Sequence, residues 1–135
     1  EREKSFSFDI KDVTIKGSID RIDKDKNGVK IIDYKTSKTA SSAKSSLQLA
    51  VYCLYLLQSS NEKIKGLPRK ATLHFLRDEE NPIKEHSFNI LELKSVEKVI
   101  EKTAKSIRDQ EFSPKKGKHC DWCDYRNLLC PEWGD

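Results

Sequence analysis

The chain has 135 residues, which is the size of one domain with an ordinary hydrophobic core. Charged residues make up 36% of it, against about a quarter in typical domains, yet the net charge is only +4. This balance permits nucleic-acid binding without establishing it, because a solvated lysine-rich surface has the same composition. The longest apolar run, residues 49–57, is far shorter than the roughly 20 residues that span a bilayer, and no secretory signal begins the sequence. We expect a cytoplasmic domain with no membrane partner.

The sequence contains no methionine and begins at Glu1, so we expect a fragment or a processed piece that lacks the N-terminal part of its domain. Cys53 stands alone, and the other three of the four cysteines lie close together within residues 120–130. Such an uneven distribution is not that of a secreted disulfide scaffold. We expect residues 1–111 to form the core of the domain and residues 112–135 to form a tail that packs on it.

Alternating apolar and polar residues predict antiparallel strands over 4–10 and 13–24, with Lys11-Asp12 as the turn between them. A third strand is predicted over 29–36. Residues 36–46 are rich in Ser, Thr, Ala and Lys, which favours a loop and the start of a helix. The strongly apolar segment 47–59 then predicts a helix that is buried on most faces.

In the second half of the chain, strands are predicted over 71–77 and 83–90, separated by a polar turn at 78–82. Apolar residues then recur at spacings of three and four, which predicts a helix over 91–109. The tail from residue 112 contains prolines and a glycine and is expected to be irregular. Together these elements predict an α/β fold in which a central mixed sheet of four or five strands is flanked by two helices.

The dipeptide Asn27-Gly28 lies between two alternating apolar runs, and this is the strongest short-range signal for a hairpin. Both residue types tolerate the positive φ of a type I′ turn. If these two residues form the loop, Lys26 pairs with Val29, and the pairing of every residue further along both strands follows by counting outward.

This counting sets Ile22 opposite Asp33 and Asp20 opposite Lys35. Opposed residues, and residues two apart on one strand, point to the same face, so Asp20, Asp33 and Lys35 share a face. Two carboxylates and an ammonium suit a magnesium site that also binds a phosphate, which predicts metal-assisted phosphodiester cleavage. The alternative is a cross-strand salt bridge between Asp20 and Lys35.

Gln48 and Tyr52 are four residues apart on the predicted helix and therefore occupy one face of it. They are polar among apolar neighbours. They are interpreted either as a hydrogen-bonded helix edge or as side chains that reach toward the strand edge, where they hold a DNA phosphate or orient the metal ligands.

Three segments in order, GSIDRID (17–23), IIDYKT (31–36) and QLAVY (48–52), resemble the signature of the RecB-like nucleases of the PD-(D/E)XK superfamily. The tail segment CDWCDYRNLLCP (120–131) resembles the cysteine cluster of their iron-sulfur subgroup, which includes AddB-type helicase-nuclease subunits and certain CRISPR-associated exonucleases. The resemblance implies a restriction-endonuclease-like core and a Mg²⁺-dependent or Mn²⁺-dependent deoxyribonuclease. It covers residues 17–52 and 120–131.

The resemblance implies a role for each matching residue. Asp20 and Asp33 would bind the divalent metal, with the main-chain carbonyl of Tyr34 as a further ligand. Lys35 would orient the attacking water and stabilise charge on the phosphorane, while Gln48 and Tyr52 would support the site and contact DNA. The family usually has a further histidine ligand on a preceding helix, and none of the three histidines in this sequence stands at the matching place: His74, His86 and His119.

The spacing of Cys120, Cys123 and Cys130 is that of metal ligands, and soft thiolates select iron-sulfur clusters or zinc. The resemblance implies a structural [4Fe-4S] cluster in the full-length protein, with a fourth cysteine from upstream of this sequence. Cys53 is an internal substitute, but its apolar helical face favours a buried thiol. His119 is the residue that would complete a zinc site instead.

Basic residues of the tail, Lys115, Lys116 and Arg126, are predicted to track a DNA backbone, with nearby aromatic residues stacking on bases. The alternative is that the aromatic residues pack around the cluster while the lysines are merely solvated. The predicted function is an exonuclease domain of a helicase-nuclease in recombinational DNA repair, acting on DNA ends or single strands beside a helicase domain or subunit. Alternatives are a CRISPR-associated RecB-like exonuclease and a catalytically inactive DNA-binding scaffold.

Overall fold

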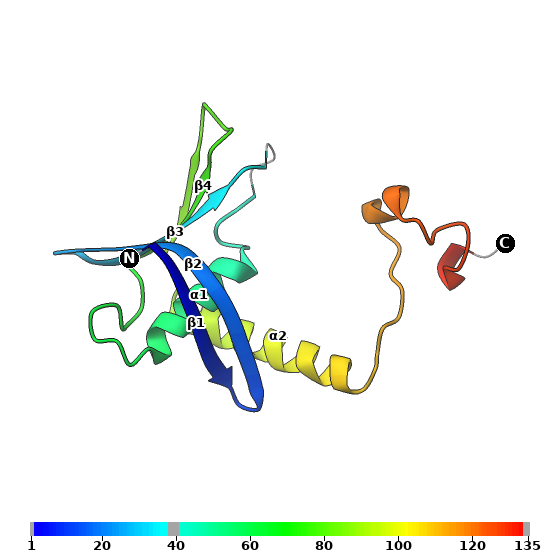
Figure 1. Cartoon of the computed structure of the whole chain (residues 1–135), viewed down its shortest axis with the longest axis horizontal. Coiled ribbons are helices and arrows are strands. Elements are labelled where there is room, and N and C mark those ends of the chain that lie inside the picture. Colours follow the sequence, from blue (N-terminus) through cyan, green and yellow to red (C-terminus); the bar gives the residue numbers. More distant parts are fainter. Residues whose placement is uncertain (1, 38–40, 134–135) are drawn as a thin grey trace. The chain divides into compact units, whose positions relative to one another are not determined.

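The computed structural model describes residues 2–37 and 41–133, and the chain divides into two compact units, 1–101 and 102–135. The first unit contains a five-stranded mixed sheet in the order β1-β2-β3-β4-β5, in which only β3 and β4 are parallel neighbours (Figure 1). The strands are β1 (Arg2–Ile10), β2 (Val13–Asp25), β3 (Gly28–Lys35), β4 (Lys70–Phe75) and β5 (Ile83–His86). The predicted α/β fold with a mixed sheet is confirmed.

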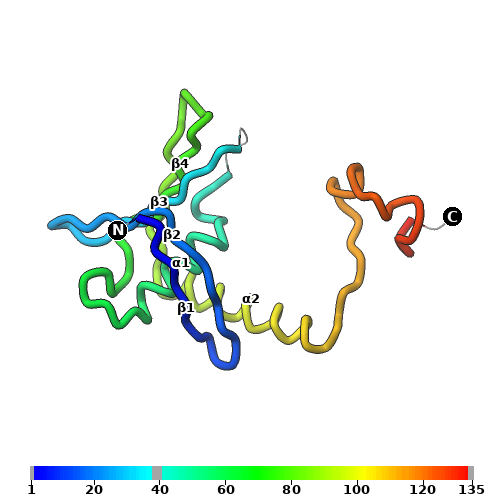
Figure 2. Tube along the Cα trace, viewed as in Figure 1, coloured from blue at the N-terminus to red at the C-terminus, as the bar shows by residue number. Residues whose placement is uncertain are grey.

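Helix α1 (Leu47–Gln58) lies in the crossover between the parallel strands β3 and β4 and packs against β1, β3 and β4 (Figure 2). Ser46 caps it, because its side-chain oxygen accepts the backbone N–H of Leu49 at 3.2 Å. Residues 38–40 of the predicted loop before this helix lie outside the described residues. No helix in the described parts of the chain is both long and apolar enough to cross a membrane.

Helix α2 (Ile90–Arg108) begins in the first unit, where Leu93 is buried and Val96 and Ile100 pack on the core. The predicted strand over 83–90 is too long, because β5 ends at His86. The reason is a capping box: the Asn89 side chain accepts the Glu92 amide at 2.9 Å, and the Glu92 carboxylate accepts the Asn89 amide at 2.8 Å. This reciprocal pair starts the helix where alternation alone predicts a strand.

The second unit is irregular apart from the end of α2 and two short 3-10 helices, η1 (Lys118–Trp122) and η2 (Pro131–Trp133). The prediction of an irregular tail agrees with this arrangement. Several large apolar side chains are exposed in it, including Phe112, Trp122, Leu128 and Leu129. The tail therefore has few apolar contacts of its own.

The β2–β3 hairpin forms, but its register differs from the predicted one by two residues. Asp25 pairs with Gly28 and Ile22 pairs with Ile31, so the loop residues are 26 and 27. The Asp25 side chain accepts the backbone N–H of Asn27 at 2.7 Å, which closes the turn one residue earlier. Of the two residues predicted to form the loop, Gly28 alone has a positive φ, at 119°. A shift by an even number leaves every side chain on its predicted face.

A Gly28→Ala substitution is expected to lower the free energy of unfolding by more than about 1 kcal/mol, because an L side chain strains a backbone held at φ 119°. Space is not the cause, since the nearest atom to an added Cβ would be Arg69 Cβ at 3.8 Å. Urea unfolding measures the effect, with Lys24→Ala in the same hairpin as the control. Equal midpoints for the two variants would contradict this account.

Strand β3 shows how the fold positions charged groups beside the core. Val29, Ile31 and Asp33 alternate along the strand, and all three are buried. Asp33 thus occupies the place in the core-facing row where another apolar residue would be expected. Its parallel neighbour in the sheet, Leu73 on β4, is also buried.

On the β4–β5 edge, Glu85 lies between Lys30 and Lys70, which are neighbours in the sheet. The carboxylate contacts the two ammonium groups at 2.7 and 2.5 Å, and these contacts lower the pKa of Glu85 to about 2. Because the folded-state pKa is lower than the unfolded-state pKa, ionised Glu85 stabilises the fold at any pH above the unfolded-state value. This stabilisation is lost as the pH falls toward 2. We expect the stability difference between the chain and its Glu85→Gln variant to shrink between about pH 4.5 and 2. Thermal melts across this range measure it, with exposed Glu79→Gln as the control.

Candidate active site

Four predicted site residues form a closed ring of contacts between β3 and α1. Lys35 Nζ lies 2.6 Å from Asp33 Oδ2 and donates to Gln48 Oε1 at 2.6 Å. Gln48 Nε2 donates to the Tyr52 hydroxyl at 2.7 Å, and that hydroxyl donates to Asp33 Oδ1 at 3.5 Å. We call this group the Asp33 ring. It forms because Asp33 and Lys35 share a strand face while Gln48 and Tyr52 share a helix face.

Burial dominates the electrostatics of the ring. The Asp33 side chain is 3% exposed, and this desolvation raises the pKa of Asp33 although Lys35 opposes the shift. Burial, together with the Asp33 charge, also raises the pKa of Tyr52 to about 12, so its hydroxyl stays a hydrogen-bond donor at neutral pH. Among the described residues, Asp33 Oδ2 receives no hydrogen bond of normal geometry and has only the ion-pair contact with Lys35.

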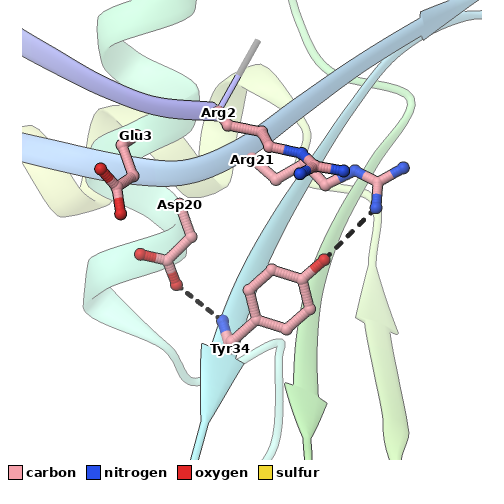
Figure 3. Close-up of a pocket in the computed structure, with 5 residues that line it drawn as sticks. All are labelled: Arg2, Glu3, Asp20, Arg21 and Tyr34. Atoms are coloured by element: carbon pink, nitrogen blue, oxygen red, sulfur yellow. Dashed lines mark hydrogen bonds between the residues drawn. The ribbon is translucent and has the colours of Figure 1, made fainter.

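Asp20 reaches the same site from β2. Its Oδ2 accepts the backbone N–H of Tyr34 at 2.8 Å (Figure 3). The last pair of the β2–β3 ladder is Arg21 with Ile32, so the next step of this register sets Asp20 opposite Asp33. The negative charge of Asp20 contributes to the raised pKa of Asp33, as expected for neighbouring carboxylates.

The predicted opposition of Asp20 and Lys35 is therefore wrong, as is that of Ile22 and Asp33. Lys35 forms its ion pair with Asp33 on its own strand, so the alternative of an Asp20–Lys35 salt bridge is also not observed. The physical cause is the earlier hairpin turn, which shifts the register by two residues. Asp33 and Lys35 contact each other, and Asp20 contacts the backbone of Tyr34 between them.

The donor set fits a divalent cation. Carboxylate oxygens are the hard ligands that Mg²⁺ prefers, and the buried Asp33 Oδ2 has only the Lys35 ammonium, at 2.6 Å, as a partner among the described residues. The amide and carbonyl of one strand residue point to the same side, so the Tyr34 carbonyl faces the Asp20 side of β3. Within the described ranges, no three His, Cys, Asp or Glu side chains are close enough to hold a metal. Two carboxylates, a carbonyl and waters match Mg²⁺, which retains several waters.

The sequence reading missed the other residues around Asp20. A pocket of about 740 Å³ is lined by Arg2, Glu3, Asp20, Arg21 and Tyr34 (Figure 3). Arg21 Nη1 donates to the Tyr34 hydroxyl at 3.4 Å, and Arg21 Nε contacts Asp23 at 2.8 Å. The signal was present in the sequence, because counting outward from the Lys11-Asp12 turn sets Arg2 opposite Arg21, as observed.

On the α1 side, a second pocket of about 430 Å³ is lined by both helix residues of the Asp33 ring, together with Phe6 and Gly17. The Phe6 ring lies over Gly17, where an added Cβ would come within 2.7 Å of it. The same ring meets Tyr52 edge-on, with centroids 5.7 Å apart. Gly17, the first residue of the GSIDRID segment, thus leaves space for the Phe6 ring to pack against Tyr52.

In the second unit, the tail cysteines are free thiols: Cys120 is buried, Cys123 is exposed and Cys130 is half-buried. The backbone N–H of Gly117 points at Cys120 Sγ at 3.3 Å. Cys53 is buried in the first unit, and this burial raises the pKa of its thiol to about 12, as expected for a packing residue.

Among the predicted DNA-contacting residues of the tail, Arg126 pairs with Asp121 at 3.0 Å and lies over the Trp133 ring at 4.0 Å. Lys116 lies 5.1 Å from the centroid of the same ring. Lys115 is exposed. Two of these three cations therefore make cation–π contacts within the tail.

The fold resembles a solved structure titled "Crystal structure of SSO0001", with a TM-score of 0.58 and 21% sequence identity. The match covers 100% of this chain and 61% of that one, so the chain spans about three fifths of the similar structure. A comparison with curated proteins gave no match. The family model described as "PD-(D/E)XK nuclease superfamily" matches residues 1–131. With this match over nearly its whole length, the chain belongs to the PD-(D/E)XK nuclease superfamily.

Proposed function

We propose that this chain is a Mg²⁺-dependent or Mn²⁺-dependent nuclease domain that hydrolyses phosphodiester bonds of DNA. The observation that carries the proposal is the buried Asp33 carboxylate, which has the Lys35 ammonium at 2.6 Å and Asp20 as a neighbouring carboxylate on β2. Burying such a group costs stability unless a cation offsets the charge, and strongly perturbed carboxylates cluster at functional sites. Membership of a nuclease superfamily supports the same conclusion.

Each residue has a role that follows from its contacts. Asp20 and Asp33 would hold the metal, which when bound polarises the phosphate and lowers the pKa of a water. Lys35 adds a fixed positive charge beside Asp33, suited to stabilise the negative charge of the transition state. Gln48 accepts a hydrogen bond from Lys35 and so fixes the ammonium, while Tyr52 donates to Asp33 and orients its carboxylate.

The test is cleavage of linear, end-labelled single-stranded DNA in Mg²⁺, in Mn²⁺ and in EDTA. We expect cleavage only with metal, and a rate on the order of 100-fold lower for Asp20→Asn. Asp9→Asn is the matched control, because Asp9 is an exposed aspartate at the far end of β1. Equal rates for the chain and Asp20→Asn would refute this site and favour the inactive DNA-binding scaffold. A circular strand that resists cleavage would support an exonuclease.

We also propose that the domain serves a helicase-nuclease in recombinational repair of DNA ends, with a CRISPR-associated exonuclease as the alternative. The order of the motif segments, residues 17–23, 31–36 and 48–52, supports this group of nucleases. The full-length protein distinguishes the two. Digestion of duplex DNA that requires ATP hydrolysis supports the helicase-nuclease, whereas ATP-independent digestion favours the stand-alone enzyme.

The proposal includes a structural [4Fe-4S] cluster held by Cys120, Cys123 and Cys130, with a fourth ligand from outside this sequence. Thiolates suit iron, and an N–H directed at Cys120 Sγ is the kind of contact that tunes cluster sulfurs. Anaerobically purified full-length protein should contain iron and acid-labile sulfide. Cys123→Ser should lose both, while Cys53→Ala should retain them. A colourless, iron-free preparation would refute the cluster.

A further inference from the structure

Two arginines lie directly opposite each other beside the candidate metal site. Arg2 on β1 and Arg21 on β2 are cross-strand partners, and both line the pocket that contains Asp20 (Figure 3). Opposed residues of an antiparallel pair have Cβ atoms about 5 Å apart, and like charges in this arrangement destabilise a sheet. An anion that contacts both guanidinium groups would offset this repulsion.

The same sheet contains a second pair of neighbouring cations, Lys30 and Lys70, which provides a comparison. There the protein supplies the anion itself, because Glu85 contacts both ammonium groups at 2.7 and 2.5 Å. No carboxylate among the described residues bridges Arg2 and Arg21 in this way. Among residues 2–37 and 41–133, Arg21 has an ion-pair partner, Asp23, which its Nε contacts at 2.8 Å, and Arg2 has none.

The contacts of Arg21 hold its guanidinium in place and leave donors available. Nε contacts Asp23 and Nη1 donates to the Tyr34 hydroxyl, so the planar group is fixed from two sides. No hydrogen bond or ion pair joins the Arg2 guanidinium to the residues that the structure describes. Two guanidinium groups that keep N–H donors without a partner in the described part of the chain, beside a pocket of about 740 Å³, match the bidentate recognition of phosphate.

We propose that Arg2 and Arg21 bind a phosphate group of the DNA strand next to the one that is cleaved. This inference rests on the proposed nuclease function, because Asp20 in the same pocket marks where the scissile phosphate would lie. The bound phosphate is either an internal phosphodiester or a phosphate monoester at a strand end. Both present the same anionic oxygens to the arginines, and the following experiment separates them.

Binding of a fluorescent single-stranded oligonucleotide is measured by anisotropy in an Asp33→Asn background, which keeps the strand intact. Three versions of the strand carry a 5′-phosphate, a 3′-phosphate or hydroxyls at both ends. We expect Arg2→Ala and Arg21→Ala each to weaken binding about tenfold, since each removes a charge-assisted hydrogen bond. Arg69→Ala is the matched control, because Arg69 is exposed and precedes β4, next to Val29 at the start of β3.

A loss confined to one phosphorylated end identifies a terminal phosphate as the ligand. A loss that is equal on all three strands identifies an internal phosphodiester, and the slope of log K against log salt should then fall by about 0.7 per lost contact. Arg21→Lys keeps the charge but not the planar fork, and it should bind more weakly than the unchanged chain. The Arg21→Ala variant loses the contacts with Asp23 and Tyr34 and could unfold for that reason. In that case Arg2→Ala, which loses neither contact, still tests the proposal.

The inference is overturned if Arg2→Ala binds all three strands as tightly as Arg69→Ala does, or if the chain binds no DNA. Its failure differs from failure of the proposed function. If the chain binds DNA through these arginines but cleaves it with neither metal, the proposed phosphate site stands and the proposed nuclease function is refuted. In an Asp33-intact chain that cleaves DNA, Arg2→Ala should raise KM about tenfold with little change in kcat. An unchanged KM overturns the inference alone.

Discussion

Asp33→Asn is expected to abolish DNA cleavage while leaving the fold as stable as before, or more stable, at neutral pH. Activity should fall on the order of 1,000-fold or more, because an amide cannot supply the anionic oxygen that a divalent cation requires. Stability should not fall, because the amide carries no charge to desolvate, and desolvation is the largest influence on the Asp33 carboxylate. Loss of activity without loss of stability is expected where a functional residue lowers the stability of the fold.

The pH dependence of this effect has a definite sign. Burial raises the folded-state pKa of Asp33, so the fold favours the protonated carboxyl. Protonated Asp33 therefore stabilises the fold. This stabilisation is fully present below the unfolded-state pKa of the aspartate, about 3.9, and is lost as the pH rises through the folded-state pKa. As the pH rises, the melting temperature of Asp33→Asn should therefore increase relative to that of the unchanged chain. Paired thermal melts from pH 3 to 8, roughly spanning both states, measure the difference.

Asp9→Asn is the control for this comparison, since Asp9 is an exposed aspartate on β1 whose carboxylate accepts a hydrogen bond from Thr14. A loss of more than about 1 kcal/mol in Asp33→Asn at pH 7 would show that the Lys35 contact outweighs the cost of burial. Retained cleavage in the same variant would remove Asp33 from the site.

Lys35→Ala should lower the cleavage rate about 100- to 1,000-fold, the range found when one electrostatic contact to a transition state is removed. It should also move the pH profile of cleavage. Lys35 is the strongest influence that lowers the pKa of Asp33, so its removal leaves burial and the Asp20 charge opposed by the weaker Tyr52 hydrogen bond. The acidic limb of the rate profile should therefore shift to higher pH.

Lys35→Arg keeps a positive charge near Asp33 and should retain the position of the acidic limb, although the larger group fits the Gln48 contact poorly. Lys94→Ala, on the exposed side of α2, is the control for general loss of positive charge. Single-turnover cleavage from pH 5 to 9, roughly bracketing the transition, provides the profiles. A Lys35→Ala profile with the same shape and a lower plateau would mean that Lys35 does not control the Asp33 pKa.

The two largest errors of the sequence reading have one physical origin, which is competition by side-chain hydrogen bonds with backbone pairing. At the hairpin, Asp25 accepts the Asn27 amide and advances the turn. At the end of β5, Asn89 and Glu92 cap each other's amides and begin α2 where alternation predicted a strand. Both contacts are local and involve residue types known for this behaviour. Residues of this kind at element ends outweigh apolar periodicity.

Some features of the candidate site were predictable from the sequence, and others depended on tertiary packing. Local strand geometry predicted that Asp20, Asp33 and Lys35 share a face, and the even shift in register left that statement intact. The closed ring with Gln48 and Tyr52 was beyond such reasoning, because it depends on where α1 packs across the sheet. The arginine pair beside Asp20 was derivable from the first turn but gained its meaning only from the pocket.

By itself, the order of residues determined which segments form strands and helices, and which side chains share a face. These properties depend on spacing along one strand or one helix, so they can be read without knowing the fold. Only the tertiary structure decided that Asp33 is desolvated and that Lys35 pairs with it rather than with Asp20. Burial and ion pairing depend on distances between elements that are far apart in the chain, and packing alone determines those distances.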